Sequence, residues 1–587
     1  MGRKMLGVLA ALVLAVGLVP GPAQADLQNP RQAFLRGAVA GLFLHWGERT
    51  APAHTSCSGW ESDVTNGGWT PNYWVSEAQK LHAQYLVLAT FHSRLGYARP
   101  WPSAIPGSCS TKRDFLGELI AAAKANGLRV ILYMTDDPQW HADGGHEWLD
   151  SKAYSTYKGK TVDLTTRDGF GQFSYDNFFE VMNRYPDLGG FWIDNDNDYW
   201  LSHNLYAQIY QKRPNYTISN NNEDTPIMDM ISNEQKTGMT PSYDYPQAVY
   251  TAAPRLTEAD FKLPSTGAWW YDGSNPTVDR TLTLGRLITN AGSSVKALMA
   301  ETAQVNGKFP SNQESFNTFA NSWLNPIWES LSGTEGGGYL YGGMQPGAWN
   351  DGAYGVTTVS KTDPDTQYIH VVTKPSTSTL KIRDNGTRVT SVRNLRTGAA
   401  ISFSQGGGSL TLTGLSGWDP YDTVFQVTTA GREGIDSASM SATASASGHP
   451  ASAAGDGDYL TYWDSNKTLP VSLRFDLGSG RKIQYLGINQ REDSVSYARS
   501  ATEQSARIKN YNVYFSSDGK NWGSPVKSAT LPSRRGVQFI DFAGTTARYV
   551  RLEVLNTYAA SSDSAHYQQL RVDEAWIGSS YVTGSGA

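Results

Sequence analysis

The sequence predicts a multidomain protein in which an α/β domain precedes two all-β domains. Three observations lead to this prediction. Patterns of short apolar strands and amphipathic helices alternate from about residue 35 to residue 345, and the helical patterns stop after Gly343. A run rich in Ser, Ala and Gly then changes the composition abruptly at residues 435–455. The chain of 587 residues also exceeds one ordinary hydrophobic core, so two to four domains are expected.

The first domain, which we place at residues 26–345, has the pattern of a parallel sheet. Between its second and third strands, Thr111 can cap a helix that Gly127 ends. Alternation of this kind, at this length, favours a closed (β/α) TIM-like barrel over an open sheet. No GxGxxG or P-loop motif follows a strand, so nothing supports a nucleotide-binding fold. The expected strands are GLFLHW (41–46), YLVLATFH (85–92), RVILYMT (129–135), GGFWID (189–194), YTISNN (216–221) and VKALMA (295–300).

The rest of the chain carries short strands separated by Gly, Ser, Asn and Asp turns. Residues 346–430 hold YIHVV, TLKIRD, SLTLTGL and TVFQVTT, which predict a small antiparallel β-sandwich. We expect a linker at 431–446 because of its Ser- and Ala-rich composition. A third, all-β unit follows at 447–580, with SLRFDLG, NYNVYFSSDGKNW, RYVRLEV and LRVDEAWIG as its clearest segments.

The N-terminus and the charge limit the location and the partners. Residues 1–25 have Arg3 and Lys4, an apolar stretch and an A-x-A site, which predict a signal peptide and therefore a secreted, extracellular protein. No later apolar run is long enough to span a membrane, so no membrane association is expected. The formal net charge of −5 argues against nucleic acid as a partner. Cys57 and Cys109 could pair in an oxidising compartment, but their spacing leaves this open.

Polar residues gather where the expected barrel strands end. In a (β/α) barrel these C-terminal tips form the mouth of the active site. The run GGFWIDNDND, residues 189–198, places Asp194 at such a tip with Trp192 beside it. A carboxylate there, together with a second acid, suits cleavage of a glycosidic bond, whereas a helix cap or an ion ligand is the alternative. The tip residues are His45, Trp46, His92, Asp136, Asp137, Asp194, Asn220 to Asn222 and Glu301.

Two other hydrolytic chemistries have weaker support. His45, His92, Asp136 and Asp194 could form a metal site, but no HxH or HExxH spacing is present. A Ser-His-Asp mechanism lacks the GxSxG motif. We therefore expect no cofactor for catalysis.

The order of the motifs resembles the alpha-L-fucosidases of glycoside hydrolase family 29. The resemblance runs from GLFLHWG through YLVLATFH, TKRDFLGELIAAAKANGLRVILYM and GGFWID to WLNPIWESLSGTEGGGYLYGG, and covers roughly residues 35–430. It implies a retaining exo-glycosidase with Asp194 as the nucleophile. It also implies that His45 and His92 bind sugar hydroxyls and that Trp46 belongs to the substrate pocket. We expect Trp192 there too, because it lies beside Asp194.

For the general acid/base the resemblance favours Glu234, in the run MDMISNEQ, with Glu223 and Glu301 as alternatives. Its carboxyl would have to lie about 5–5.5 Å from that of Asp194 and be protonated when the leaving oxygen departs. Where the family has two adjacent histidines, this chain has His92, Ser93 and Arg94. A galactose-like or uronic substrate, or a non-catalytic sugar-binding barrel, therefore remains as an alternative to alpha-L-fucosidase activity.

The C-terminal unit resembles a discoidin-type, or coagulation factor 5/8 C, β-sandwich of the jelly-roll kind. The residues that carry the resemblance are AAGDGDYLTYW, RFDLG, NYNVYFSSDGKNW, ARYVRLEV and VDEAWIG. The resemblance implies a carbohydrate-binding module with a glycan ligand and a structural Ca²⁺, whereas without it Asp456-Gly457-Asp458 is an ordinary turn. Tyr497, Tyr558 and Arg491 could contact the sugar. The implied calcium ligands are Asp456, Asp458, Thr461 and Glu574.

Overall fold

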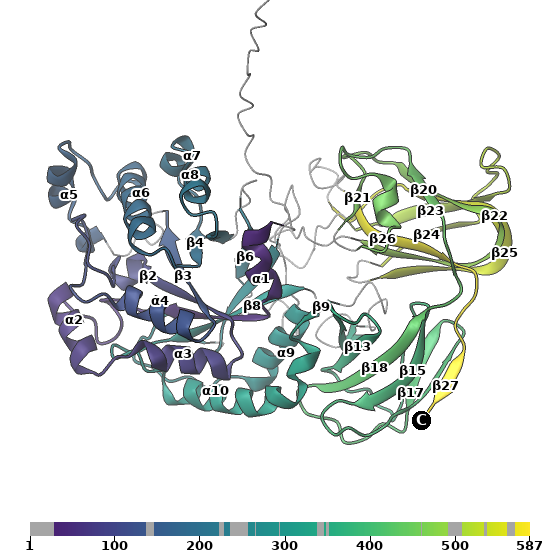
Figure 1. The fold of residues 1–587 in the computed structure, drawn as a ribbon, viewed down its shortest axis with the longest axis horizontal. Coiled ribbons are helices and arrows are strands. Elements are labelled where there is room, and N and C mark those ends of the chain that lie inside the picture. Colours follow the sequence, from purple (N-terminus) through teal and green to yellow (C-terminus); the bar gives the residue numbers. More distant parts are fainter. Residues whose placement is uncertain are drawn as a thin grey trace, which may run out of the picture.

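The computed structural model shows three parts, a barrel ringed by helices and two all-β units (Figure 1). It describes residues 29–136, 146–221, 228–234, 256–264, 266–292, 294–336, 346–347, 352–458, 461–490, 507–532, 537–559 and 570–587. The expected signal peptide, residues 1–25, lies outside the described residues. Within the described residues, no helix is both long and apolar enough to cross a membrane.

The first part is a closed barrel of eight parallel strands, which confirms the predicted fold class. The first and last strands pair along their length, so the sheet has no free edge. Most strand residues are buried, because helices cover the outer face and side chains fill the interior. The strands are β1 (Ala40–His45), β2 (Tyr85–Phe91), β3 (Arg129–Thr135), β4 (Gly190–Asp194), β5 (Thr217–Asn221), β6 (Met230–Glu234), β7 (Leu256–Lys262) and β8 (Val295–Thr302).

Two of these strands, β6 and β7, were not among the expected ones. Ser232, Glu234, Glu258 and Asp260 alternate along them and face the barrel interior with Met230 and Leu256. The pattern predicts poorly here because polar residues occupy the face that apolar residues fill in the other strands. A strand with this composition looks like a loop until its neighbours are known.

The helices form a layer around the barrel (Figure 1). In α4, five apolar side chains form the face that packs on the sheet, and Gly127, at φ +74°, allows the chain to turn after the helix ends. The cap of α4 is Asp114 and not Thr111, because the Asp114 carboxylate accepts the backbone N–H of Gly117 at 2.9 Å. The helices are α1 (Ala33–Gly37), α2 (Cys57–Asn66), α3 (Pro71–Lys80), α4 (Phe115–Ala125), α5 (Ser151–Lys158), α6 (Arg167–Arg184), α7 (Asp198–Ser202), α8 (Leu205–Lys212), α9 (Arg280–Ala291) and α10 (Ser311–Leu324).

The second part has two antiparallel sheets, as the sequence predicts for a β-sandwich. One sheet has the order β15-β18-β13-β12-β9 and the other β14-β17-β16-β27. The last strand, β27, comes from the C-terminal end of the chain and pairs with β16 (Figure 1). The strands are β9 (Thr334–Gly336), β12 (Gly355–Ser360), β13 (Thr366–Val371), β14 (Leu380–Arg383), β15 (Thr387–Asn394), β16 (Ser402–Gly406), β17 (Ser409–Thr413), β18 (Thr423–Arg432) and β27 (Gly584–Gly586).

The third part is an antiparallel β unit with its own hydrophobic core. The segment expected to be a linker, 431–446, contains two of its strands, because β19 pairs with β26 and β20 pairs with β22. In β20, Ser439 and Ser441 alternate with Met440 and Ala442. The small residues of this strand give it the composition of a linker. The strands are β19 (Ile435–Asp436), β20 (Ser439–Ala442), β21 (Trp463–Asp464), β22 (Val471–Gln490), β23 (Asn510–Ser516), β24 (Lys527–Thr530), β25 (Gln538–Val554) and β26 (Arg571–Gly578).

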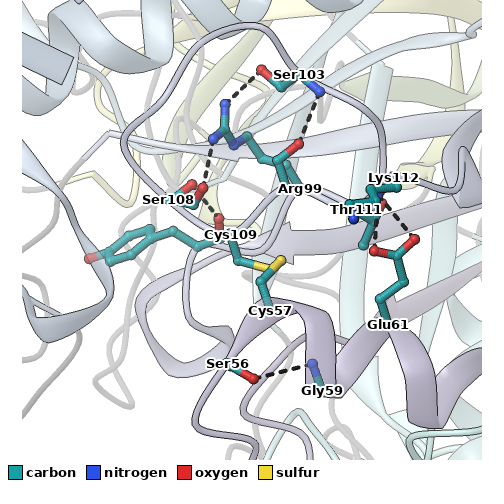
Figure 2. The surroundings of a disulfide bond; sticks show 12 residues. Ser56, Cys57, Gly59, Glu61, Arg99, Ser103, Ser108, Cys109, Thr111 and Lys112 are labelled. Carbon is teal, nitrogen blue, oxygen red and sulfur yellow. Dashed lines mark hydrogen bonds between the residues drawn. A yellow bond between two sulfur atoms is a disulfide. The ribbon is translucent and has the colours of Figure 1, made fainter. Parts of the chain in front are cut away.

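A disulfide between Cys57 and Cys109 joins α2 to the long loop that follows β2 (Figure 2). On the same helix, Glu61 accepts the backbone N–H of Lys112 at 3.0 Å. The buried Arg99 side chain donates to the Ser108 carbonyl at 2.8 Å and thereby organises the loop from inside. The loop begins directly after His92, so these contacts stabilise one wall of the barrel mouth.

Candidate active site

Asp194 ends β4 at the C-terminal mouth of the barrel, as expected from its place in the sequence. Its carboxylate accepts the hydroxyl of Tyr133 on β3 at 2.6 Å and the side-chain amide of Asn221 on β5 at 3.1 Å. The next residue, Asn195, has φ +63°, a left-handed conformation that Asn tolerates better than most residues. The chain therefore turns away directly after Asp194, which is held by one hydrogen bond from each neighbouring strand.

A second carboxylate, that of Glu234 at the end of β6, lies close to Asp194. The Asn221 amide nitrogen contacts both residues, at 3.1 Å to Asp194 Oδ1 and 3.5 Å to Glu234 Oε1. The sum of these two distances is the upper limit for the separation of the two oxygens. A separation of roughly 5–5.5 Å between the two carboxyl groups, which is typical of retaining glycosidases, is compatible with this limit.

Burial and hydrogen bonding act in opposite directions on Asp194. Burial raises the pKa of the carboxyl above its ordinary value, and the negative charge of Glu234 raises it further. The hydrogen bonds from Tyr133 and Asn221 lower the pKa, because they stabilise the ionised form. Two donors therefore help to keep a buried carboxylate charged.

His45 and His92 lie at the ends of β1 and β2, on the same side of the barrel as Asp194. Burial strongly lowers the pKa of His45, and the neighbouring His92 lowers it further, so the His45 ring is neutral at neutral pH. The His92 Nδ1 atom accepts the backbone N–H of Arg94 at 3.0 Å. A neutral His92 ring therefore carries its proton on Nε2, where it can act as a hydrogen-bond donor.

Two tryptophans in the loop after β7 complete the mouth, and the sequence did not single them out. The ring of Trp269 lies 5.6 Å from His45, and that of Trp270 lies 6.0 Å from His92. Both tryptophans are partly exposed. Apolar faces of sugars stack on such rings. The signal in the sequence was the pair Trp269-Trp270 shortly after a strand, but β7 itself was not recognised.

Trp46 does not belong to this mouth. It is fully buried among the helices, 4.9 Å from Trp60 and 5.1 Å from Trp74 between ring centres, and its indole N–H donates to the Gln304 carbonyl at 3.1 Å. His45 faces the barrel interior, so the next residue along the strand direction faces outward. The expectation that Trp46 lines the substrate pocket is therefore wrong.

Trp192 lies below the mouth and not on its surface. It is 2% exposed, stacks on Tyr133 at 5.5 Å and donates its indole N–H to Glu258 Oε1 at 2.9 Å. Direct contact with a substrate, as expected from the sequence, does not fit this position. The indole instead supports the ring of Tyr133, which in turn holds Asp194.

Other polar residues from the strand tips have different roles. Glu301 is fully buried on the outer face of β8, where the charge of Glu77 acts on it, so it does not face Asp194 and cannot be the acid/base. Asp136 is held by Arg167 at 2.6 Å. Asn220 donates to Asp196 at 3.3 Å. Asp137, Asn222 and Glu223 lie outside the described residues, and no group of three or more metal-binding side chains occurs in the part of the chain that the structure describes.

Comparison with known proteins matches this architecture. Residues 61–326, which include most of the barrel, match the family model "Alpha-L-fucosidase", and residues 437–568 match the "F5/8 type C domain". The barrel is therefore similar to the alpha-L-fucosidase family. Rat tissue alpha-L-fucosidase is 26% identical over 255 residues, which cover 36% of this chain and 52% of the rat protein. The chain thus spans about half the length of the curated fucosidase relatives it matches.

Solved fucosidases share the fold. A GH29 alpha-L-fucosidase from Bacteroides thetaiotaomicron, trapped as a covalent intermediate with 2-fluoro-fucosyl fluoride, superimposes with a TM-score of 0.53 at 18% identity and covers 69% of this chain and 98% of its own. The alpha-L-fucosidase from Vibrio sp. strain EJY3 has a TM-score of 0.54 at 14% identity, with 94% and 98% covered. At this identity the similarity concerns the fold, and it includes the all-β parts in the Vibrio protein.

In the F5/8 type C domain, the expected calcium ligands Asp456, Asp458 and Thr461 share one loop, and that loop is tied to Glu574, but their three carboxyl groups do not gather into a site that could hold a metal ion. The Thr461 hydroxyl contacts Asp456 Oδ2 at 2.8 Å and the Asp458 carbonyl at 3.0 Å, and the Gly457 N–H donates to Glu574 Oε1 at 2.7 Å. Burial and the charge of Asp456 raise the pKa of Glu574 to about 7. Carboxylate, hydroxyl and carbonyl oxygens are the kinds of ligand that a hard cation such as Ca²⁺ prefers. Arg491 and Tyr497 lie outside the described residues, and Tyr558 donates its hydroxyl to the Leu531 carbonyl at 2.6 Å.

Proposed function

We propose that this protein is a secreted, retaining exo-glycosidase that removes terminal alpha-L-fucosyl residues from glycans. The observation that carries the proposal is the bridge from Asn221 to both Asp194 and Glu234 at the mouth of the barrel. A pair of carboxyls at this spacing is what double displacement requires. The fucosidase family match supports the sugar, and the trapped covalent intermediate of the Bacteroides neighbour supports the mechanism.

The reaction has two steps. In the first, Asp194 attacks the anomeric carbon while the bond to the leaving oxygen breaks, and Glu234 gives its proton to that oxygen. In the second, Glu234 takes a proton from water, whose oxygen attacks the same carbon and releases Asp194 as a carboxylate. Two displacements at one carbon retain its configuration.

The other residues of the mouth would bind the sugar. His45, neutral because of its burial, offers ring nitrogens to hydroxyl groups without adding a charge, and His92 lies beside it at the mouth. Trp269 and Trp270 would pack against the apolar face of the sugar ring and its methyl group. Trp192 and Tyr133 would act from beneath by fixing Asp194.

The nucleophile is tested with Asp194→Gly. We expect the variant to lose hydrolysis of 4-nitrophenyl alpha-L-fucoside and to form a glycosyl azide of inverted configuration when azide is added, because azide replaces the missing carboxylate. Glu301→Gln is the matched control, since that carboxyl lies on the outer face of the barrel and its loss should leave activity unchanged. Failure of azide rescue, in a variant that keeps the wild-type fold, would refute the role of Asp194.

Glu234→Ala tests the acid/base in the same assay. Hydrolysis of substrates with activated leaving groups should be spared, because such groups depart without a proton, while poor leaving groups should lose about 10²–10⁴-fold in kcat/KM. An equal loss with both kinds of substrate would assign the role to Glu223.

The substrate alternatives rest on one sequence difference, the Ser93-Arg94 pair that follows His92. Arg94 would bring a positive charge near the mouth, which favours a uronic or otherwise anionic sugar as the second candidate. A panel of nitrophenyl glycosides of fucose, galactose and glucuronic acid separates these options. Activity with none of them, together with glycan binding, would favour a sugar-binding protein on an inactive barrel.

The accessory features belong to the same proposal. The Cys57–Cys109 disulfide is typical of an oxidising compartment, and it supports secretion through the N-terminal signal peptide. The F5/8 type C domain would bind a glycan and hold a structural Ca²⁺ through Asp456, Asp458, Thr461 and Glu574. Mass spectrometry of the secreted protein would test cleavage after Ala25.

A further inference from the structure

A third carboxyl, that of Asp260 on β7, lies beside the proposed acid/base. Asp260 is in register with Glu234 on the neighbouring strand β6. Residues paired across parallel strands point to the same face of the sheet, and neighbouring strands lie about 4.8 Å apart. Asp260 and Glu234 therefore face the barrel interior side by side.

Among the residues that the structure describes, those that act most strongly on Asp260 are acidic. It is 2% exposed, and its paired residue on β8 is the apolar Leu298. The Ser232 hydroxyl contacts Asp260 Oδ1 at 3.3 Å. The acidic side chains that act on it most strongly are Glu234 from β6, Glu258 from its own strand and Asp194 from β4.

Two lysines lie near this cluster, and the charge of Lys296 acts on Glu258. Lys296 on β8 is paired with Glu258, two residues before the position of Asp260, and donates to the Arg36 carbonyl at 3.1 Å. Lys262 lies two residues beyond Asp260 and donates to the Gly267 carbonyl. Burial and the three neighbouring carboxylates raise the pKa of Asp260 far above its ordinary value. A buried acid in such a cluster keeps its proton and becomes a hydrogen-bond donor.

We propose that Asp260 is a positioning residue for the acid/base, a neutral carboxylic acid whose O–H group supports Glu234 whenever Glu234 is ionised. This inference rests on the proposed glycosidase function. In the first step Glu234 loses its proton to the leaving oxygen while Asp194 becomes an ester and loses its charge. With Asp260 neutral, the carboxyl groups of Asp194, Glu234 and Asp260 together carry one negative charge both before and after that step. The negative charge moves from Asp194 to Glu234, and the O–H group of Asp260 stabilises it on Glu234.

The proposal fixes the sign of a pH effect. A hydrogen bond to the ionised form of the acid/base favours loss of its proton, so loss of the donor should move the alkaline limb of kcat/KM to higher pH. The alkaline limb of kcat/KM reports this ionisation in the free enzyme. If Asp260 were instead a carboxylate, its charge would oppose loss of the proton from Glu234, and every neutral replacement would move the limb to lower pH.

The experiment compares Asp260→Leu, which keeps the branching of the side chain and removes the donor, with Asp260→Asn, which keeps a neutral donor. For Asp260→Leu we expect the alkaline limb to move to higher pH and kcat/KM to fall about 10- to 100-fold with a poor leaving group. With a dinitrophenyl leaving group it should stay within about threefold of wild type, because that group needs no proton. Asp260→Asn should keep the wild-type profile with both substrates.

Three outcomes would overturn the inference. They are a shift of the limb to lower pH in both variants, an unchanged limb in both, or an equal loss with the two leaving groups. Thermal unfolding of both variants identifies a simple packing defect, which lowers activity without a leaving-group dependence. If wild type hydrolyses no glycoside, the proposed function fails, whereas normal behaviour of wild type and Glu234→Ala isolates a failure of the inference about Asp260.

Discussion

The charge of the nucleophile depends on single contacts. Asp194 is buried deeply enough for its pKa to rise, and two donors from adjacent strands oppose that rise. Each hydrogen bond to a charged group contributes about 1.5–3 kcal/mol. The balance between burial and these donors therefore sets the lowest pH at which the site can work.

Removal of the Tyr133 hydroxyl should shift this balance. In Tyr133→Phe the ionised form of Asp194 loses a donor, so its pKa rises and the acid limb of kcat/KM moves to higher pH. At a pH just above the wild-type limb we expect kcat/KM to fall about 10- to 100-fold, the equivalent of one hydrogen bond to a charge. A pH–rate profile measures both effects, and a limb that stays in place or moves to lower pH would contradict the assigned contact.

Individual elements add constraints of their own. Helix α2 is tied to the loop after β2 by the Cys57–Cys109 disulfide and by Glu61, and that loop starts at the barrel mouth (Figure 2). In the third part, the loop around Asp456 is tied to β26 through Glu574. Both connections join segments that are distant in the sequence.

Loss of the disulfide should destabilise the barrel. The bond closes a loop with a sequence separation of 52 residues, and cross-links of this kind typically contribute about 2–4 kcal/mol. We expect the double variant Cys57→Ser/Cys109→Ser to unfold at a lower urea concentration than wild type. The change in the free energy of unfolding should be larger than the change in the activation free energy that kcat reports. An unchanged midpoint under conditions where wild type is shown to be oxidised would contradict this expectation.

Calcium binding to the F5/8 type C domain should depend on pH. The pKa of Glu574, raised to about 7, means that a proton competes with the cation, so affinity for Ca²⁺ should fall as the pH decreases through 7. Without Ca²⁺ the sign is reversed, because the folded state holds the proton more tightly than the unfolded state, and stability falls as the pH rises towards 7. Calorimetric titration at pH 6 and pH 8, with Glu574→Gln as a variant that cannot ionise, measures this linkage. Equal affinity at both values would exclude Glu574 as a ligand.

The whole molecule is joined in an order that the chain sequence does not suggest. After the third part is complete, β27 returns and pairs with β16 of the second part (Figure 1). Arg383 on β14 forms two hydrogen bonds, of 2.9 and 2.7 Å, with Asp541 on β25, and its guanidinium lies 4.4 Å from the Phe539 ring. The two all-β parts are therefore connected by a salt bridge, ring contacts and a shared strand.

Deletion of residues 583–587 should weaken this connection. Without β27, β16 becomes an edge strand, and the second and third parts lose one of their shared elements. We expect wild type to unfold these two parts in one calorimetric transition and the truncated protein to unfold them in two. Persistence of a single transition at the wild-type temperature would show that the contacts of Arg383 are enough to connect the two parts without β27.

The order of strands and helices could be predicted from the sequence, because the spacing of apolar residues that distinguishes them is a local property of the chain. Alternating strands and helices predicted the barrel, and short strands between turns predicted the two all-β parts. Asp194, His45 and His92 could be proposed because each ends a strand, or nearly so, and parallel strands end together, whereas Glu234 was proposed from the family resemblance alone. The sequence patterns did not predict β6 and β7, because the inward face of these strands is polar. They did not predict β20 either, because its small residues resemble a linker.

The direction of each side chain depended on closure of the barrel. Successive strand residues point to opposite faces, so the difference of one position separates His45 at the mouth from Trp46 among the helices. The same rule places Glu301 on the outer face and Asp260 on the inner one. The bridge from Asn221 to the two carboxylates, and the meeting of Trp269 with His45, join residues from different strands and loops. No local pattern contains such contacts, because they exist only once distant segments share one cavity.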